Sequence, residues 1–295
     1  MSAAPDALPA AQAAPDGTAR GPAGRRRATA SLLIGATLVG LVVLTALVSF
    51  IWTPYDPLRV DATARLLGPS GEHLLGTDRF GRDTVSQLMV GARTTLFVGF
   101  IAVGLAAVVG IPLGVFASMS TSWLGSATMR ANDLLLAFPA LLLAIMFGAV
   151  FGASTLTAMV AIGVATIPAF ARIARSGALQ VLSSEYVLAA RAAGRRRVGI
   201  AVRHVLPNIS GLLIVQASVS FAIAVLAEAA LSFLGFGTRP PTPSWGRMLQ
   251  ESQEFLYLTP RLALVPGIGI AMVVLGFNLL GDGLRDRFDP KLEDR

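Results

Sequence analysis

Long uncharged stretches alternate with short charged segments along most of the chain. A helix needs about 20 apolar residues to cross the hydrocarbon core of a bilayer. Five tracts reach that length, and the tract from 134 to 171 is too long for one span, because a helix rises about 1.5 Å per residue. Turn-forming residues at 152–155 divide it, so the pattern predicts an all-α membrane protein with about six spans. The predicted spans lie near Thr29–Trp52, Thr95–Met119, Ala131–Phe151, Thr155–Arg172, Ile209–Leu234 and Leu262–Gly281.

The spans define one transmembrane domain at 29–283, which holds a polar loop at 173–208 between the fourth and fifth spans. Residues 1–28 are rich in alanine, proline and glycine without periodicity, and this predicts a disordered tail. A short tail is also predicted at 284–295. The uncharged run after Arg27 exceeds the roughly 7–15 apolar residues of a signal peptide, and no convincing cleavage site follows. An uncleaved first span is therefore favoured over a signal peptide.

Charge is scarce and almost all of its positive part is arginine. Charged residues make up 14% of the chain, against about 25% in soluble domains, and Lys291 is the only lysine. Arginines gather in both tails, in the turn at 121–130 and in the loop at 173–208. The positive-inside rule then predicts a multi-pass inner-membrane protein with both termini in the cytoplasm and external loops at 54–93 and 237–260. Because the arginines flank apolar spans, membrane lipid is the expected partner and nucleic acid is not.

Several kinds of chemistry are excluded by residue type. The chain has no cysteine, so it can form no disulfide or thiolate metal site. A nucleotide-binding P-loop needs a Gly-Lys-Ser/Thr triplet, but Lys291 follows Pro290. Only two histidines are present and neither lies in a span, which argues against an intramembrane hydrolase. We therefore predict that the chain is non-catalytic and binds no metal or other cofactor itself.

The loop at 173–208 has the features of two short helices. Ser184 can act as an N-cap with Glu185 in the first turn, and Gly194 can end the helix with a positive φ. A second basic helical segment then reaches Leu206 and Pro207. By themselves these residues equally fit an amphipathic loop whose arginines lie at the lipid headgroups.

At this point the chain resembles the inner-membrane permease subunits of binding-protein-dependent ABC importers. Their cytoplasmic signature is Glu-Ala-Ala, three residues, Gly, nine residues, Ile, any residue, Leu-Pro. The matching residues are Ala189, Ala190, Gly194, Leu206 and Pro207. Leu188 stands at the Glu position and His204 at the Ile position, so position 188 cannot make the polar contact of that Glu. Glu185, one turn earlier, is a candidate substitute.

Three further segments resemble the second permease of dipeptide, oligopeptide and nickel importers. They are 73–83 in the first external loop, 228–246 after the fifth span and 277–286 near the end, and the whole resemblance covers Leu32 to Pro290. The candidate residues of the external loop are His73, Gly76, Thr77, Asp78, Gly81, Arg82 and Asp83. Spacings of five residues in a glycine-rich loop fit no standard metal pattern, so turn formation and packing of an external gate are favoured.

Two residues outside these loops are also singled out. Glu228 lies inside the fifth span, where a charge is costly and marks function. Pairing with a helix and contact with substrate are both open for it. Trp245 is predicted to anchor the external loop at the membrane interface.

The resemblance implies the fold, activity and partners. The fold would be that of a type I importer permease with cytoplasmic coupling helices. The chain would form a heterodimer with a second permease, served by two ATPase subunits that use ATP and Mg²⁺ and by an external solute-binding protein. Together they would import di- or oligopeptides by alternating access. The alternatives are import of nickel complexes or another small solute and, less favoured because Glu228 is the only clear ionisable residue at mid-membrane, a stand-alone secondary transporter.

Overall fold

The computed structural model describes residues 22–120 and 123–288, which form helices and loops without a β-strand. The long helices are α1 (Pro22–Val48), α2 (Thr84–Met119), α5 (Thr155–Leu182), α8 (Leu206–Phe233) and α10 (Arg261–Phe288). The shorter ones are α3 (Trp123–Ala137), α4 (Ala140–Phe151), α6 (Glu185–Ala192), α7 (Arg197–Ile200) and α9 (Trp245–Ser252), with 3-10 turns η1 (Ala62–Ala64) and η3 (Gln253–Phe255) and a π-helical segment η2 (Ala201–Val205). Among the described residues, five helices are long and apolar enough to cross a membrane, and α3 with α4 makes a sixth span if the bent pair counts as one.

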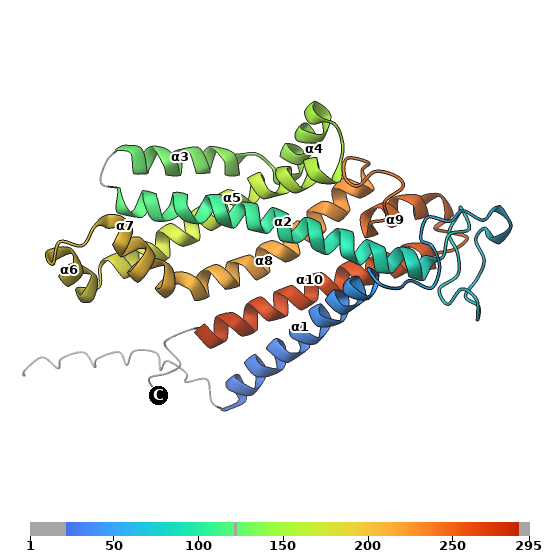
Figure 1. Cartoon of the computed structure of the whole chain (residues 1–295), viewed down its shortest axis with the longest axis horizontal. Helices are drawn as coiled ribbons and strands as arrows, with labels where there is room; N and C mark the ends of the chain where they lie inside the picture. The colour runs from blue at the N-terminus through green and yellow to red at the C-terminus, as the bar shows by residue number, and fades with distance from the viewer. Residues whose placement is uncertain (1–21, 121–122, 289–295) are drawn as a thin grey trace, which may run out of the picture.

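The helices form an elongated bundle with two distinct ends (Figure 1). Helices α2, α5 and α8 pack against one another, while α1 and α10 pair along one side and α10 contacts α8. Helices α6 and α7 lie at one end of the bundle, and the loop at 49–83 lies with α9 at the other. The polar loop at 173–208 and the loop at 49–83 are thus separated by the length of the bundle.

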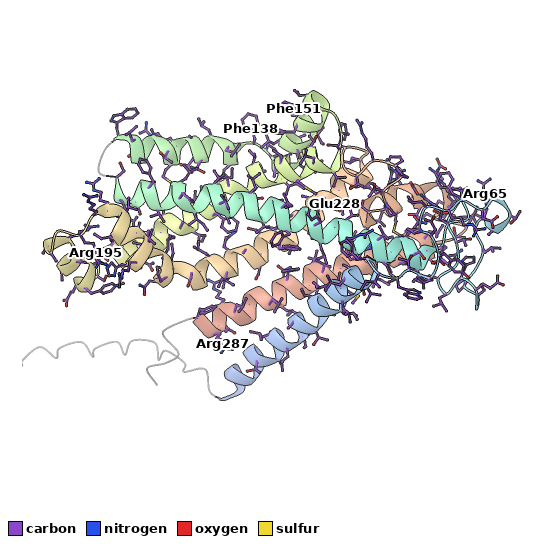
Figure 2. The ribbon with its side chains drawn as sticks, viewed as in Figure 1. Arg65, Phe138, Phe151, Arg195, Glu228 and Arg287 are labelled. Carbon is purple, nitrogen blue, oxygen red and sulfur yellow. The ribbon has the colours of Figure 1, made fainter. Side chains whose placement is uncertain are left out.

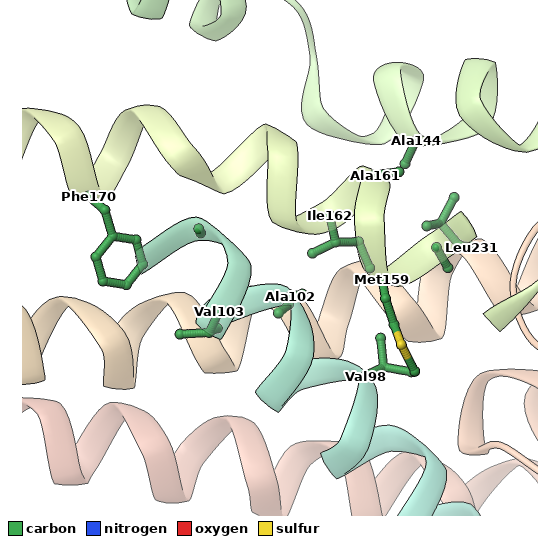
Figure 3. Close-up of a cluster of buried hydrophobic side chains, with 12 residues drawn as sticks. Val98, Ala102, Val103, Ala144, Met159, Ala161, Ile162, Phe170 and Leu231 are labelled. Atoms are coloured by element: carbon green, nitrogen blue, oxygen red, sulfur yellow. The ribbon is translucent and has the colours of Figure 1, made fainter. Parts of the chain in front are cut away.

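The centre of the bundle is built from small and branched side chains contributed by four helices. Figure 3 shows Val98 and Ala102 of α2 beside Met159 and Ile162 of α5, and all four are nearly or fully buried. Leu231 of α8 and Ala144 of α4 complete the same cluster. Small residues at these positions let the helices approach closely, as is common in membrane bundles.

Two glycines bring the backbones of α2 and α5 into contact. A Cβ atom on Gly110 would lie 2.6 Å from the carbonyl oxygen of Ile167, and one on Gly114 would overlap the carbonyl oxygen of Ala171. The glycines are four residues apart and therefore on one face of α2. This is the small-xxx-small arrangement that membrane helices use for close packing.

The predicted third span, near Ala131–Phe151, is divided between two helices. Helices α3 and α4 meet at an angle of 85° around Phe138 and Pro139. Proline lacks an N–H group and disfavours helical backbone at the residue before it, so the helix ends at Ala137. The break was not predicted because one proline hardly changes the mean hydropathy or the periodicity of a long uncharged tract.

Several helix ends also differ from the predicted bounds. Helix α2 begins at Thr84, well before Thr95, because Asp83 accepts a hydrogen bond from Ser86 N and caps it. Helix α1 starts at Pro22, inside the predicted tail, and α10 continues to Phe288, past the predicted start of the second tail. Helix α5 extends to Leu182. The rest of both predicted tails, 1–21 and 289–295, lies outside the described residues.

Trp245 is not an interfacial anchor. Its side chain is 2% exposed and its Nε1–H donates to the carbonyl oxygen of Leu88 at 3.0 Å. The indole contacts the helix backbones at Gly91 of α2 and Gly269 of α10, where no side chain intervenes. Trp245 therefore joins α9 to two spanning helices.

Candidate functional site

The predicted two short helices of the loop at 173–208 are present as α6 and α7. Helix α6 begins after Ser184, which occupies the N-cap position, but the Ser184 hydroxyl donates to Val181 O and makes no capping bond. The helix ends at Ala192, and Gly194 follows the C-cap Ala193 with a φ of 78°, which confirms the predicted positive value. The N–H of Gly194 bonds to Arg191 O, and that of Arg195 to Ala190 O. This pair of bonds is a Schellman motif, which requires the left-handed glycine.

One face of α6 is anchored in the bundle and the other is open. Val187 is fully buried in an apolar cluster with residues of α2, α5, α7, η2 and α8. Tyr186 and Leu188 are about half exposed, and Ala189 is exposed beside them. Glu185 is exposed in the first turn, and Ala190 is half-buried. The open face therefore consists of two larger side chains and a small residue that leaves room next to them.

The coupling segment, 185–206, is joined to α8 without an intervening loop. Helix α7 passes into η2, where the N–H of Leu206 bonds to Ala201 O in the wide π pattern. Pro207 follows in the first turn of α8, where its missing N–H costs little. Helix α7 is therefore continuous with α8, whereas α6 is joined to α7 through the turn at 193–196.

His204, which departs from the signature, lies in η2 and connects it to α6. Its ring lies 5.9 Å from the Tyr186 ring, and its Nε2 is 3.5 Å from Nη1 of Arg195. The signature residues Leu206 and Pro207 start α8 directly below it. The histidine thus packs α6 against η2 at the position where the family signature has isoleucine.

At the opposite end, the candidate external residues build a folded loop. Asp78 accepts hydrogen bonds from the Phe80 and Arg82 backbone N–H groups, from Arg82 Nε at 2.7 Å and from Gln87 Nε2 at 2.8 Å. Arg82 is 8% exposed and also forms an ion pair with Glu251 of α9. Glu251 in turn accepts from Arg247. A buried chain of alternating charges therefore ties the loop to α2 and α9.

The other predicted loop residues hold its turns. His73 Nδ1 lies 3.0 Å from Asp83 Oδ1, and the Thr77 hydroxyl donates to Ala64 O. Gly76 and Gly81 have φ values of 71° and 76°, in the region that favours glycine. The seven candidates thus form the framework of this loop. Within 22–120 and 123–288, no three His, Cys, Asp or Glu side chains are grouped as metal ligands.

Arg261, which the sequence did not indicate as a site residue, joins the same loop to α10. Its guanidinium donates to the carbonyl oxygens of Leu75, at 2.7 Å, and of Leu67. It also fills the space beside Gly76, where a Cβ atom would overlap it. The only signal in the sequence is an arginine at the start of the last span, which by itself indicates no partner.

Glu228 is fully buried inside its own chain, partway along the bundle (Figure 2). Its Oε1 accepts from the Ser232 hydroxyl at 2.7 Å and from the Thr238 hydroxyl at 3.4 Å, and its Oε2 accepts from the Thr95 hydroxyl of α2 at 3.4 Å. The carboxyl group therefore connects α8 with α2 and with the segment before α9. This arrangement suits the pairing of helices.

Three comparisons place this arrangement among known proteins. Residues 110–294 match the family described as the binding-protein-dependent transport system inner membrane component. Over 88% of its length the chain is 41% identical to the dipeptide transport system permease protein DppC of Alkalihalophilus pseudofirmus, covering 86% of that protein. It is 40% identical to the di/tripeptide permease DppC of Pseudomonas aeruginosa, covering 88% of it, and 38% identical to the glutathione permease GsiD of Pectobacterium atrosepticum, covering 87%, each over 88% of this chain.

A solved structure shares the fold. The inward-facing MetNI methionine ABC transporter superposes with a TM-score of 0.56 at 18% identity, over 68% of this chain and 96% of the matched chain. At that identity the likeness concerns the fold alone. It confirms the predicted all-α importer-permease fold.

Proposed function

The chain belongs to the family of binding-protein-dependent transport system inner membrane components, and from this premise we propose how it imports short peptides. The observation that carries the substrate class is the identity of 38–41%, over 88% of the chain, to permeases for dipeptides, di- and tripeptides, and glutathione. All of these substrates are short peptides. A peptide is therefore favoured over a nickel complex, although the external loop resembles those of both peptide and nickel importers.

The coupling segment is the proposed contact with the ATPases. Permeases of this family work with ATPase and binding-protein components. We assign two cytoplasmic ATPase subunits, which use ATP and Mg²⁺, to the transporter, and one of them to the open face of α6 at Tyr186, Leu188 and Ala189. Closure of the ATPases would displace α6, which packs against α7, η2 and α8 through the apolar cluster around Val187. The continuous helix from α7 through η2 would then move α8 with it. This chain itself would perform no covalent chemistry.

A second permease is the proposed partner within the membrane. Helices α3 and α4 leave large apolar side chains uncovered, and α4 exposes Leu142, Met146, Val150 and Phe151. Figure 2 shows Phe138 and Phe151 on this outer side of the bundle. Such a surface suits an apolar protein partner or lipid. Peptide would cross at the interface of the two permeases, after delivery by the external solute-binding protein.

The proposed orientation places the coupling segment and both termini in the cytoplasm. We expect reporter fusions after Arg27, within 195–197 and after Asp289 to read as cytoplasmic, because arginines gather there. Fusions near Leu67 and Thr242 should read as external. Paired alkaline phosphatase and fluorescent-protein fusions measure both sides. An external signal within 195–197 would contradict the proposed ATPase contact.

Reconstitution tests the transport function directly. Liposomes that contain this chain, its second permease and the ATPases should accumulate a labelled dipeptide only with ATP inside and binding protein outside. The chain alone should neither hydrolyse ATP nor transport, because it lacks a P-loop. Uptake by this chain alone without ATP would support a secondary transporter. If an excess of a nickel complex blocked uptake of the labelled dipeptide and unlabelled dipeptide did not, the proposed substrate class would be wrong.

A further inference from the structure

An exposed ion pair joins α3 to α5 within the spanning part of the bundle. Nη2 of Arg172 donates to Oδ1 of Asp133 at 3.0 Å, and the two side chains are 61% and 59% exposed. Neither residue entered the candidate sites derived from the sequence. Arg130, one turn before Asp133, is exposed on the same face of α3.

The depth of the pair follows from its place along the two helices. Asp133 lies ten residues after the start of α3 at Trp123, and Arg172 lies ten residues before the end of α5 at Leu182. Both are therefore about 15 Å from the same end of the bundle. The 28 residues of α5 measure about 42 Å, about 12 Å more than the hydrocarbon core. If all of that excess protruded at this end, the pair would lie about 3 Å inside the edge of the hydrocarbon core.

Exposure at this depth needs an explanation, because charged side chains within a membrane face water or protein partners and avoid lipid. The next residue of α3, Leu134, points about 100° away around the helix and is 70% exposed, as a side chain facing lipid would be. Arg175 of α5, one turn after Arg172, has a buried Nε–H with no hydrogen-bond partner. Three arginines and one aspartate thus give this face a positive balance.

We propose that the face formed by Arg130, Asp133, Arg172 and Arg175 lines the water-filled translocation path. We further propose that the Asp133–Arg172 pair opens to bind the charged ends of a passing peptide. Arg172 offers a guanidinium to the terminal carboxylate, and Asp133 a carboxylate to the terminal ammonium. The inference rests on the proposed peptide import. It identifies the residues of this chain that contact the peptide in the half of the membrane nearer the coupling segment.

The natural absence of cysteine makes the location testable. Asp133→Cys and Arg172→Cys, each in the assembled transporter with cysteine-free partners, should react with a charged, membrane-impermeant methanethiosulfonate, because only thiols in water ionise and react. The matched control Leu134→Cys should remain unlabelled in the same time. Added dipeptide should slow the labelling of the first two variants. If they stay as unreactive as the control, the face is covered by lipid or by the second permease and the proposal is wrong.

The contact with the peptide has its own readout. Arg172→Gln should raise the KM for a dipeptide about tenfold with little change in kcat, as loss of a charged hydrogen bond predicts. Arg172→Lys should retain most of the affinity. For the same dipeptide with an amidated carboxyl end, the KM should be the same in the natural chain and in Arg172→Gln. An equal effect on both peptides would overturn the proposed contact. Because ATP-dependent dipeptide uptake by the Leu134→Cys transporter tests peptide import separately, failure of the two proposals can be distinguished.

Discussion

Replacing Gly194 with valine is expected to abolish ATP-driven uptake while leaving the chain inserted in the membrane. Gly194 has a φ of 78° and closes the Schellman motif at the end of α6. A β-branched residue in this conformation costs about 1–2 kcal/mol, so the turn would open and α6 would lose its orientation. The spanning helices do not include this residue. ATPase co-purification, ATPase stimulation by loaded binding protein and dipeptide uptake should fall together.

A matched control separates backbone strain from side-chain size. Asparagine tolerates the left-handed region, and a Cβ atom on Gly194 meets nothing within 4 Å. Gly194→Asn should therefore retain most uptake. Ala190→Asp, which adds charge and bulk to half-buried Ala190 of α6, should resemble Gly194→Val. Wild-type transport by Gly194→Val and Ala190→Asp, with ATPases normally bound, would mean that the segment only lies at the membrane surface.

Gly114→Val is expected to destabilise the whole bundle. Even a Cβ atom at this position would overlap the Ala171 carbonyl and lie 2.9 Å from Cβ of Ala174. The two central helices α2 and α5 would have to separate, and overpacking of this kind costs about 3 kcal/mol. The loss should appear as a lower melting temperature of the purified chain and a smaller folded fraction in size-exclusion chromatography.

Gly104 provides the control on the same helix. A Cβ atom there has no neighbour within 4 Å, so Gly104→Val changes the same residue type in α2 without forcing α5 away. Its melting temperature should stay close to that of the natural chain. Equal destabilisation by the two substitutions would show that valine within α2, and not the approach to α5, is responsible.

Features that depend on neighbouring residues were predictable from the sequence. Hydropathy located the spans because a membrane helix satisfies its own backbone and needs only length and apolar side chains. The positive φ of Gly194 was predicted for the same reason, since a helix end depends on residues a few positions away. The positions of α6 and α7 followed from the same local signals.

Features that depend on distant residues were decided by the tertiary structure. Tryptophan is a residue type that often anchors proteins at the membrane interface. Trp245 is nevertheless buried, because Gly91 and Gly269, far away in the chain, leave space for its ring. The ion pairs of Arg82 with Glu251 and of Arg172 with Asp133 likewise join residues that no local pattern relates. Uniform apolar composition specifies that a helix crosses the membrane but not which face meets which neighbour. Those contacts depend on shape and polar pairing between helices, which exist only once the bundle has assembled.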